Sequence, residues 1–192
     1  MKSIITHCIS ESIAAKQRIL QDEDFIQKIE NAVMLISKAF QQGNKVWFCG
    51  NGGSAADAQQ LAAEFSGRFY KDRKALPAEA LHCNTSYLTA VANDYDYHVI
   101  YSRLIDGLGS EGDVLIGLST SGNSKNIIQA FETAKEKNIQ KLGFTGLSGG
   151  KMKATSDILF NVPSDDTPRI QECHMLIGHI ICQLVEEEIF GK

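Results

Sequence analysis

The sequence predicts an α/β protein of the flavodoxin-like, three-layer αβα class, with a central parallel sheet of about five strands. Two observations predict it: short apolar runs of strand length recur along the chain, and segments long enough for a helix separate them. The runs are "KVWFC" (45–49), "EALHC" (79–83), "DVLIGL" (113–118), "KLGFT" (141–145) and "DILFNV" (157–162). Strands that alternate with helices form a parallel sheet covered by helices on both faces.

Length and composition favour one domain, residues 1–192, of the ordinary globular type. The chain has 192 residues, 43% hydrophobic and 22% charged, which is enough for one substantial core. Its net charge of −4 argues against a partner that is a nucleic acid or an anionic membrane, because such partners need a basic face. A phosphorylated substrate remains possible, since local donors decide phosphate binding.

Two helices precede the first predicted strand. One carries a stripe of Ile5, Ile9, Ile13 and Leu20, and the second has apolar residues at helical spacing from Phe25 to Phe40, ahead of Gly43. A single flavodoxin-like unit has no obvious place for the first helix. We therefore expect residues 1–43 to form N-terminal helices that pack in an oligomer, and residues 44–192 to form the α/β core.

A long helix is predicted at the end of the chain, over about 169–188. Thr167 is the expected N-cap and Pro168 suits the first turn. The apolar residues of this helix spread over more than one face: Ile170, Met175, Ile177, Ile180, Ile181, Leu184 and Val185. A helix with so broad an apolar surface needs a second burial partner, which favours a homo-oligomer. The alternative is a helix buried on two sides within one domain.

Cysteine usage and hydropathy predict a cytoplasmic, soluble protein. The five cysteines are scattered, odd in number and without a CxxC pair, as expected for reduced thiols. The N-terminal residues "MKSIITHCISESIAAKQ" are too polar for a signal peptide. No apolar run approaches the roughly 20 residues of a membrane span.

The first glycine-rich turn, "GNGGS" at 50–54, follows the first predicted strand and begins a helix. Such turns bring backbone N–H groups and the positive end of a helix to an anion. The turn also satisfies the dinucleotide pattern through Gly50, Gly52 and Ala55. Two helices ahead of the strand, and Asn84 in place of an acidic ribose ligand after the second strand, argue against a dinucleotide site.

The second turn, "STSGNS" at 119–124, suggests a phosphate monoester more strongly. Hydroxyl groups gather there at the end of a buried-strand pattern, and a helix follows. They belong to Ser119, Thr120, Ser121 and Ser124. A structural reading makes Ser124 a helix N-cap, which explains one serine. Four hydroxyls in six residues fit a ligand better.

Few side chains are available for chemistry beside these turns. Glu64 lies on the helix after the first turn, and Gln60 lies one helical turn earlier on the same face. Gln171, His174 and His179 lie on the last predicted helix. Taken alone, each of these residues would more simply be a solvated or hydrogen-bonded helix residue. The prediction of an active site therefore depends on the two turns.

Across its whole length the chain resembles the sugar isomerase (SIS) family and, within it, the phosphoheptose isomerases. The motifs that carry this resemblance stand in the family's order and spacing: "CGNGGSAADAQ", "GRF", "VANDYDY", "GDVLIGLSTSGNS", "TGLSGGKM", "VPSDDTPRIQECH" and "IGHIICQLVEEE". The resemblance implies a homotetramer that converts sedoheptulose 7-phosphate to glycero-manno-heptose 7-phosphate, the first step towards nucleotide-activated heptose for lipopolysaccharide or capsule.

The resemblance also implies roles for particular residues. Glu64 would be the base and His179 the acid of an enediol proton transfer. Gln171 would touch the substrate, and Glu64, Gln171 and His179 would hold the family's zinc ion. The phosphate would be held by Ser119, Thr120, Ser121 and Ser124, and the sugar by Asn51, Gly52, Gly53, Ser54, Asn93 and Asp94.

At one position the chain departs from the family pattern. The family's fourth zinc ligand is a histidine one turn before the glutamate, and Gln60 stands there in this sequence. An amide oxygen is a poorer zinc ligand than imidazole, so we expect weakened or altered zinc binding. Gln171 and His179 are eight residues apart on one helix, which favours a site completed by a neighbouring subunit.

Two other functions compete with this interpretation. One is a non-catalytic SIS protein that binds a partner such as a replication initiator; proteins of that kind tend to lack the glutamate and the last histidine, which are present here. The other is an isomerase of another sugar phosphate. Several of those carry additional ligand-sensing domains, for which this chain has no room.

Overall fold

One parallel sheet of five strands forms the centre of the computed structural model, which describes residues 1–191. The strand order is β2-β1-β3-β4-β5, the flavodoxin-like order expected from the sequence. The strands are β1 (Val46–Gly50), β2 (Ala78–Ala80), β3 (Val114–Leu118), β4 (Gln140–Thr145) and β5 (Ile158–Asn161). β2 is shorter than the apolar run that predicts it, because the chain turns after Ala80, whose carbonyl accepts the Cys83 N–H.

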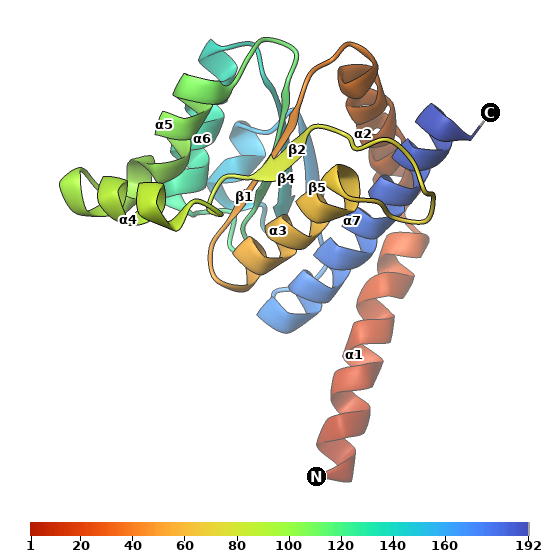
Figure 1. The fold of residues 1–192 in the computed structure, drawn as a ribbon. Helices are drawn as coiled ribbons and strands as arrows, with labels where there is room; N and C mark the ends of the chain where they lie inside the picture. Colours follow the sequence, from red (N-terminus) through yellow and green to blue (C-terminus); the bar gives the residue numbers. More distant parts are fainter. Residues whose placement is uncertain (192) are drawn as a thin grey trace.

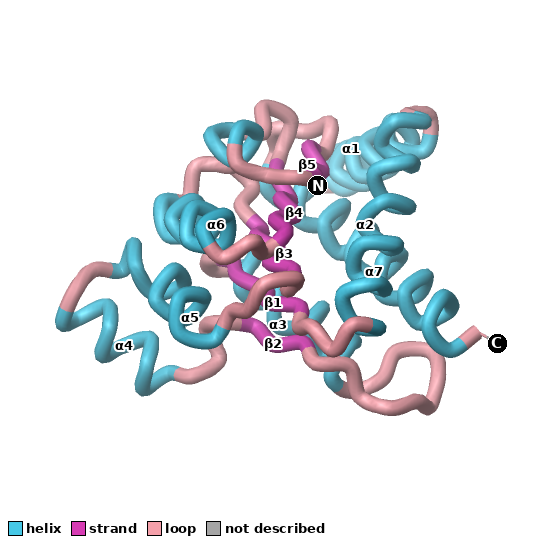
Figure 2. The backbone as a smooth tube through the Cα atoms, turned by 90° about the horizontal axis from the view of Figure 1, so that it is seen from above, coloured by secondary structure: helices cyan, strands magenta, loops and turns pink. Residues whose placement is uncertain are grey.

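Seven α-helices and two short 3-10 helices surround the sheet in the described residues. They are α1 (Lys2–Leu20), α2 (Glu23–Gln41), α3 (Gly53–Ser66), α4 (Thr85–Asp94), η1 (Tyr97–Val99), α5 (Ile100–Leu108), α6 (Lys125–Glu136), η2 (Gly150–Ala154) and α7 (Thr167–Phe190). Viewed along the sheet, α2 and α7 lie on one side and α5 and α6 on the other (Figure 2). These are the predicted three layers.

Each face of the sheet is covered by its own apolar cluster. β1 and β3 are buried along their whole length, which explains why their sequences are continuous apolar runs. On one face, Phe144 and Phe160 contact each other and belong to a cluster that includes residues of α2, α3 and α7. On the other face, Phe131 of α6 and Ile105 of α5 lie in a second cluster. Burial on both faces fixes the sheet as the rigid base of the molecule.

The two N-terminal helices differ in how far their own chain buries them. Oligomer contacts of residues 1–43 stay a prediction, but the apolar stripe of α2 belongs to the core of its own chain. Its Phe25 ring lies 5.7 Å from the Phe160 ring, and Ile29, Ile36 and Phe40 are buried. α1 projects from the body (Figure 1), and its stripe is exposed: Ile5 54%, Ile9 56%, Ile13 51% and Leu20 75%.

Polar contacts attach the inner half of α1 to the start of α7. Ser12 Oγ donates to Glu172 at 2.6 Å, and Lys16 lies 3.5 Å from the same carboxylate. Arg169 donates to the Cys8 carbonyl. Burial alone would raise the pKa of Glu172, but the Ser12 hydrogen bond and the nearby Arg169 and Lys16 charges outweigh it and lower this pKa. The direction of α1 is therefore set by charged partners close to Gln171.

The start of α7 differs slightly from the sequence prediction. Asp166, not Thr167, holds the N-cap position, and no side chain caps the helix there. Pro168 lies in the first turn, as expected. Among residues 1–191, no helix combines the length and apolar character needed to cross a membrane.

Candidate functional site

The two predicted turns lie at the same edge of the sheet. They follow β1 and β3, which pair in parallel from Val46 with Val114 to Gly50 with Leu118. β1 has β2 on its other side, so the order of the chain reverses at this pair of strands. In open parallel sheets, ligands bind at such a reversal, outside the carboxyl ends of the strands.

The second turn presents its hydroxyl groups together. Ser119 and Ser124 are joined by a hydrogen bond of 2.8 Å between their Oγ atoms. Ser124 holds the N-cap position of α6, but its side chain makes no capping hydrogen bond. Helix capping by the hydroxyl group therefore does not explain this serine. The hydroxyl groups therefore gather beside the free N–H groups at the start of α6, which is the arrangement that suits a phosphate.

The loop after β4, residues 145–152, forms backbone hydrogen bonds to this turn. Gly146 N–H donates to the Thr120 carbonyl at 2.8 Å, and Met152 N–H donates to the Gly122 carbonyl at 3.0 Å. Gly122 and Gly150 both have positive φ, and a Cβ atom on Gly150 would collide with the Ser121 carbonyl. The "TGLSGGKM" motif (145–152) thus supports the turn at 119–124, a role that its sequence alone does not indicate.

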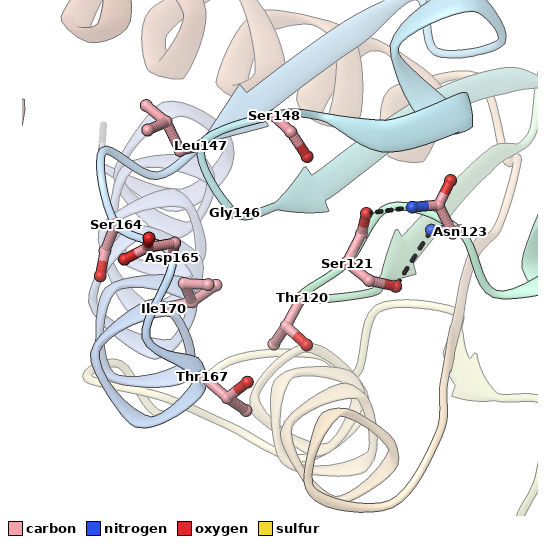
Figure 3. Close-up of a pocket in the computed structure, with 10 residues that line it drawn as sticks. All are labelled: Thr120, Ser121, Asn123, Gly146, Leu147, Ser148, Ser164, Asp165, Thr167 and Ile170. Carbon is pink, nitrogen blue, oxygen red and sulfur yellow. Dashed lines mark hydrogen bonds between the residues drawn. The ribbon is translucent and has the colours of Figure 1, made fainter.

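A cavity of about 450 Å³ opens between these loops and the start of α7 (Figure 3). Thr120, Ser121 and Ser148 line one part of it, and Asp165 and Thr167 line another. Asn123 lies at the same edge and fixes the turn through a 2.9 Å bond to the Ser121 carbonyl. The cavity gives a ligand held by the hydroxyl groups direct access to solvent.

The first turn is tied to the second by a pair of asparagines. Asn51 and Asn126 exchange side-chain hydrogen bonds of 3.0 and 2.8 Å, and the Tyr97 hydroxyl donates to Asn51 at 3.1 Å. Asn126 is buried at the start of α6. Asn51 was predicted to line the sugar site, and here its amide links the two turns. Asn126 was missed, because a single asparagine in a helix sequence carries no signal.

Glu64 and His179 lie side by side on neighbouring helices. Glu64 Oε1 of α3 is 3.9 Å from His179 Nε2 of α7, and Gln60 Nε2 is 3.5 Å from the same nitrogen. The helices approach closely because residue 178 is glycine: a Cβ there would lie 2.5 Å from a methyl group of Leu61. The predicted base and acid are therefore brought together, with 21% and 35% of their side chains exposed.

The remaining predicted residues divide into three groups. Gln171 reaches the start of α3, where its Nε2 lies 2.5 Å from the position of a Cβ on Gly53; Gly52 and Ser54 adjoin it. Asn93 and Asp94 lie at the exposed end of α4 and bond each other at 2.9 Å, so their sugar contact stays a prediction. His174 is buried against Phe144, and burial lowers its pKa to about 4, which makes it a core residue.

The side chains near His179 do not by themselves fit a zinc site. They offer one carboxylate, one imidazole and the neutral amide of Gln60. Within residues 1–191, no three His, Cys, Asp or Glu side chains gather closely enough to hold a metal ion. Zinc sites in proteins use three or four imidazole, thiolate or carboxylate ligands.

Comparison with known proteins assigns the chain to a family and agrees with this fold. The chain belongs to the SIS domain family, whose model matches residues 10–146. The phosphoheptose isomerase of Clostridium acetobutylicum is 53% identical over 100% of this chain and 98% of its own length. Phosphoheptose isomerase 2 of Campylobacter jejuni is 52% identical, covering 100% and 96%. Within the SIS family, the chain is thus a member of the phosphoheptose isomerases.

A solved structure supports the same assignment. The phosphoheptose isomerase of Neisseria gonorrhoeae superposes with a TM-score of 0.91 at 40% identity, covering 97% of this chain and 98% of that one. This membership excludes the dinucleotide-binding interpretation of the first turn. It also explains why the sequence motifs extend over the whole chain.

Proposed function

We propose that the protein converts sedoheptulose 7-phosphate to D-glycero-D-manno-heptose 7-phosphate, the first step of nucleotide-activated heptose synthesis for lipopolysaccharide or capsule. The observation that carries the proposal is the pairing of Glu64 with His179 near a hydroxyl-rich loop at the open edge of the sheet. The names of the full-length relatives supply the substrate.

Proton transfer assigns separate roles to the two side chains. In the open-chain ketose, the Glu64 carboxylate removes a proton from C1, and a C1–C2 double bond forms as the carbonyl oxygen on C2 gains a proton. His179 donates that proton or protonates the ring oxygen when the ring opens. The C1 hydroxyl then gives its proton to His179, which is neutral after its first donation, and Glu64 returns a proton to C2, which leaves an aldehyde on C1. A general acid or base positioned in this way typically raises the reaction rate by ~10²–10⁴-fold.

Phosphate binding is assigned to Ser119, Thr120, Ser121 and Ser124 with the free N–H groups of α6. The ester end of the substrate would sit at this loop, and the reacting end would point towards Glu64. Asn51, tied to Asn126, would hold the two ends of the site at a fixed separation.

The proposal is tested by incubating the purified protein with sedoheptulose 7-phosphate in deuterium oxide. We expect an aldoheptose phosphate to form, with deuterium at C2. If this ketose is not converted but a shorter ketose phosphate is, the protein is an isomerase of another sugar phosphate. Tight binding of sugar phosphates without any exchange would favour a binding protein.

We propose that the working form is a homotetramer whose sites lie at subunit interfaces, with α1 contacting other copies of the chain. The exposed stripe on the projecting α1 supports this: a single chain leaves Ile5, Ile9 and Ile13 each more than half exposed. Such apolar stripes are usually covered by a partner.

We expect the double variant Ile5→Glu Ile9→Glu to have a smaller assembly mass than the wild type by light scattering, because two charges would be buried at the interface. Gln17→Glu adds one charge at an exposed polar position of the same helix and should keep the wild-type mass. Equal masses for all three proteins would show that the stripe is not an interface.

We propose that zinc binds weakly because Gln60 replaces a histidine ligand. Gln60→His would place an imidazole at the position whose amide nitrogen now lies 3.5 Å from His179 Nε2. We expect elemental analysis to find more zinc per subunit in Gln60→His than in the wild type, purified identically. Gln59→His, at the exposed neighbouring position, is the control for added surface imidazole. Equal, full zinc content in wild type and Gln60→His contradicts the proposal.

Cytoplasmic location is also a proposal, supported by the cysteines. Cys8, Cys49, Cys83, Cys173 and Cys182 are all free thiols. Burial strongly raises the pKa of Cys49 and of Cys182, which keeps these thiols protonated and unreactive. A chain built in this way does not depend on an oxidising compartment for its stability.

A further inference from the structure

A buried ion pair holds one loop against the catalytic helices. Arg73 and Glu186 meet at 2.8 Å, and their side chains are only 3% and 2% exposed. Arg73 lies in the loop that joins α3 to β2, and Glu186 lies on α7, seven residues after His179. Residues seven apart share one face of a helix. The loop runs past α7 in Figure 1.

The Glu186 carboxylate binds the backbone of this loop as well as Arg73. It accepts hydrogen bonds from the N–H groups of Phe69 at 3.3 Å, Tyr70 at 2.9 Å and Lys71 at 2.9 Å. Burial would raise the pKa of Glu186, but these N–H groups and Arg73 outweigh it and lower the pKa. The carboxylate is therefore ionised at neutral pH and fixes three consecutive residues.

Arg73 also reaches the helix that carries the base. Its guanidinium donates at 2.7 Å to the Glu64 carbonyl and at 2.7 Å to the Phe65 carbonyl, at the end of α3. A carbonyl at a helix end has no partner within the helix, so Arg73 satisfies the Glu64 carbonyl, and it shares the Phe65 carbonyl with the Leu76 N–H at 3.1 Å. One ion pair thus joins the end of α3, the loop and α7.

The loop places Phe69 directly on the acid. The Phe69 ring stacks on the His179 imidazole with centroids 5.5 Å apart and planes inclined by 22°. Rotation about the second side-chain torsion of histidine is soft, so neighbours must fix the ring plane. Stacking on one face leaves Nε2 directed towards Glu64, 3.9 Å away. Offset stacking of this kind stabilises one orientation of the ring.

We propose that Phe69 is a positioning residue for His179, held in place by the Arg73–Glu186 ion pair. The proposal rests on the proposed function, since it assumes that His179 is the acid. It assigns no substrate contact to Phe69. The stacked ring keeps the imidazole in the orientation that faces Glu64 before substrate arrives.

The test compares Phe69→Leu, Phe69→Tyr and the wild type. We expect kcat to fall roughly 10- to 100-fold in Phe69→Leu with little change in KM, because a misplaced catalytic group loses about this much. Phe69→Tyr keeps the aromatic face and should restore most of kcat. Phe25→Leu is the matched control: it removes an aromatic ring of α2 that packs on Phe160, 5.7 Å away and outside the site, and its loss should leave kcat unchanged.

A spectroscopic measurement separates positioning from general destabilisation. The stacked Phe69 ring should shift the proton resonances of the His179 imidazole upfield through its ring current. Phe69→Leu should lose this shift, Phe69→Tyr should keep it, and His179→Gln assigns the signals. A Phe69→Leu variant with wild-type kcat or with unmoved imidazole signals overturns the proposal, provided the wild type isomerises the sugar. A wild type without isomerase activity overturns the proposed function instead.

Discussion

Glu64→Gln is expected to lose turnover while keeping substrate affinity. Glutamine has nearly the same shape as glutamate but cannot accept a proton from carbon at neutral pH. Removing a general base typically lowers kcat by ~10²–10⁴-fold. Glu64 lies on α3 and the hydroxyl groups proposed to hold the phosphate lie in the separate turn at 119–124, so phosphate binding should persist. Steady-state kinetics and calorimetric titration of the ketose phosphate measure the two quantities separately.

Gln59→Glu is the matched control for this prediction. It places a carboxylate at the exposed neighbouring helix position and should leave kcat at the wild-type level. Near-normal turnover in Glu64→Gln would exclude Glu64 as the base. Loss of binding together with turnover would mean that Glu64 holds the substrate in its ground state, which is a different role.

Removal of two hydroxyl groups from the phosphate loop is expected to raise KM. In Ser119→Ala Ser124→Ala, the hydrogen-bonded pair of Oγ atoms disappears. Hydrogen bonds to a charged group are worth about 1.5–3 kcal/mol each, so KM should rise by roughly 10²-fold or more. Because the phosphate binds equally in ground and transition states, kcat should change much less.

The loop variant needs a control that removes a hydroxyl group elsewhere in the chain. Ser102→Ala serves this purpose, because the Ser102 hydroxyl donates to the Val99 carbonyl at the start of α5, outside the turn and its supports, and its loss should leave KM unchanged. Inorganic phosphate should inhibit the wild type competitively and the double variant much more weakly. An unchanged KM in the double variant would show that the phosphate binds at another part of the protein.

The strands of the sheet could be predicted from the sequence because a buried strand leaves a local pattern, a short continuous apolar run. Continuous apolar runs such as 113–118 identify strands buried on both faces, and all five predicted strands exist. The position of α2 was not predictable in the same way. Its apolar stripe shows that it must be covered, but not whether a neighbouring element or another subunit covers it. The Phe25–Phe160 contact joins residues 135 positions apart, which periodicity cannot show.

For the site, the sequence proposes the motif residues but not the residues that support them. Glu64, His179 and the serine turn stand in recognisable patterns, so they could be proposed as site residues from the sequence. Asn126 and Phe69 each act through one neighbouring side chain, Asn51 and His179 respectively. A side chain that only orients another one leaves no pattern of its own, and a three-dimensional structure is required to find it.

The glycine at position 178 restricts how this enzyme could be redesigned. Any larger residue would push Leu61 outward and widen the gap between the two helices that bear the reacting groups. Libraries intended to change the preferred sugar should therefore hold positions 61 and 178 constant. The positions to vary are Ser148, Ser164 and Asp165, which line the cavity and where new side chains would extend into open space.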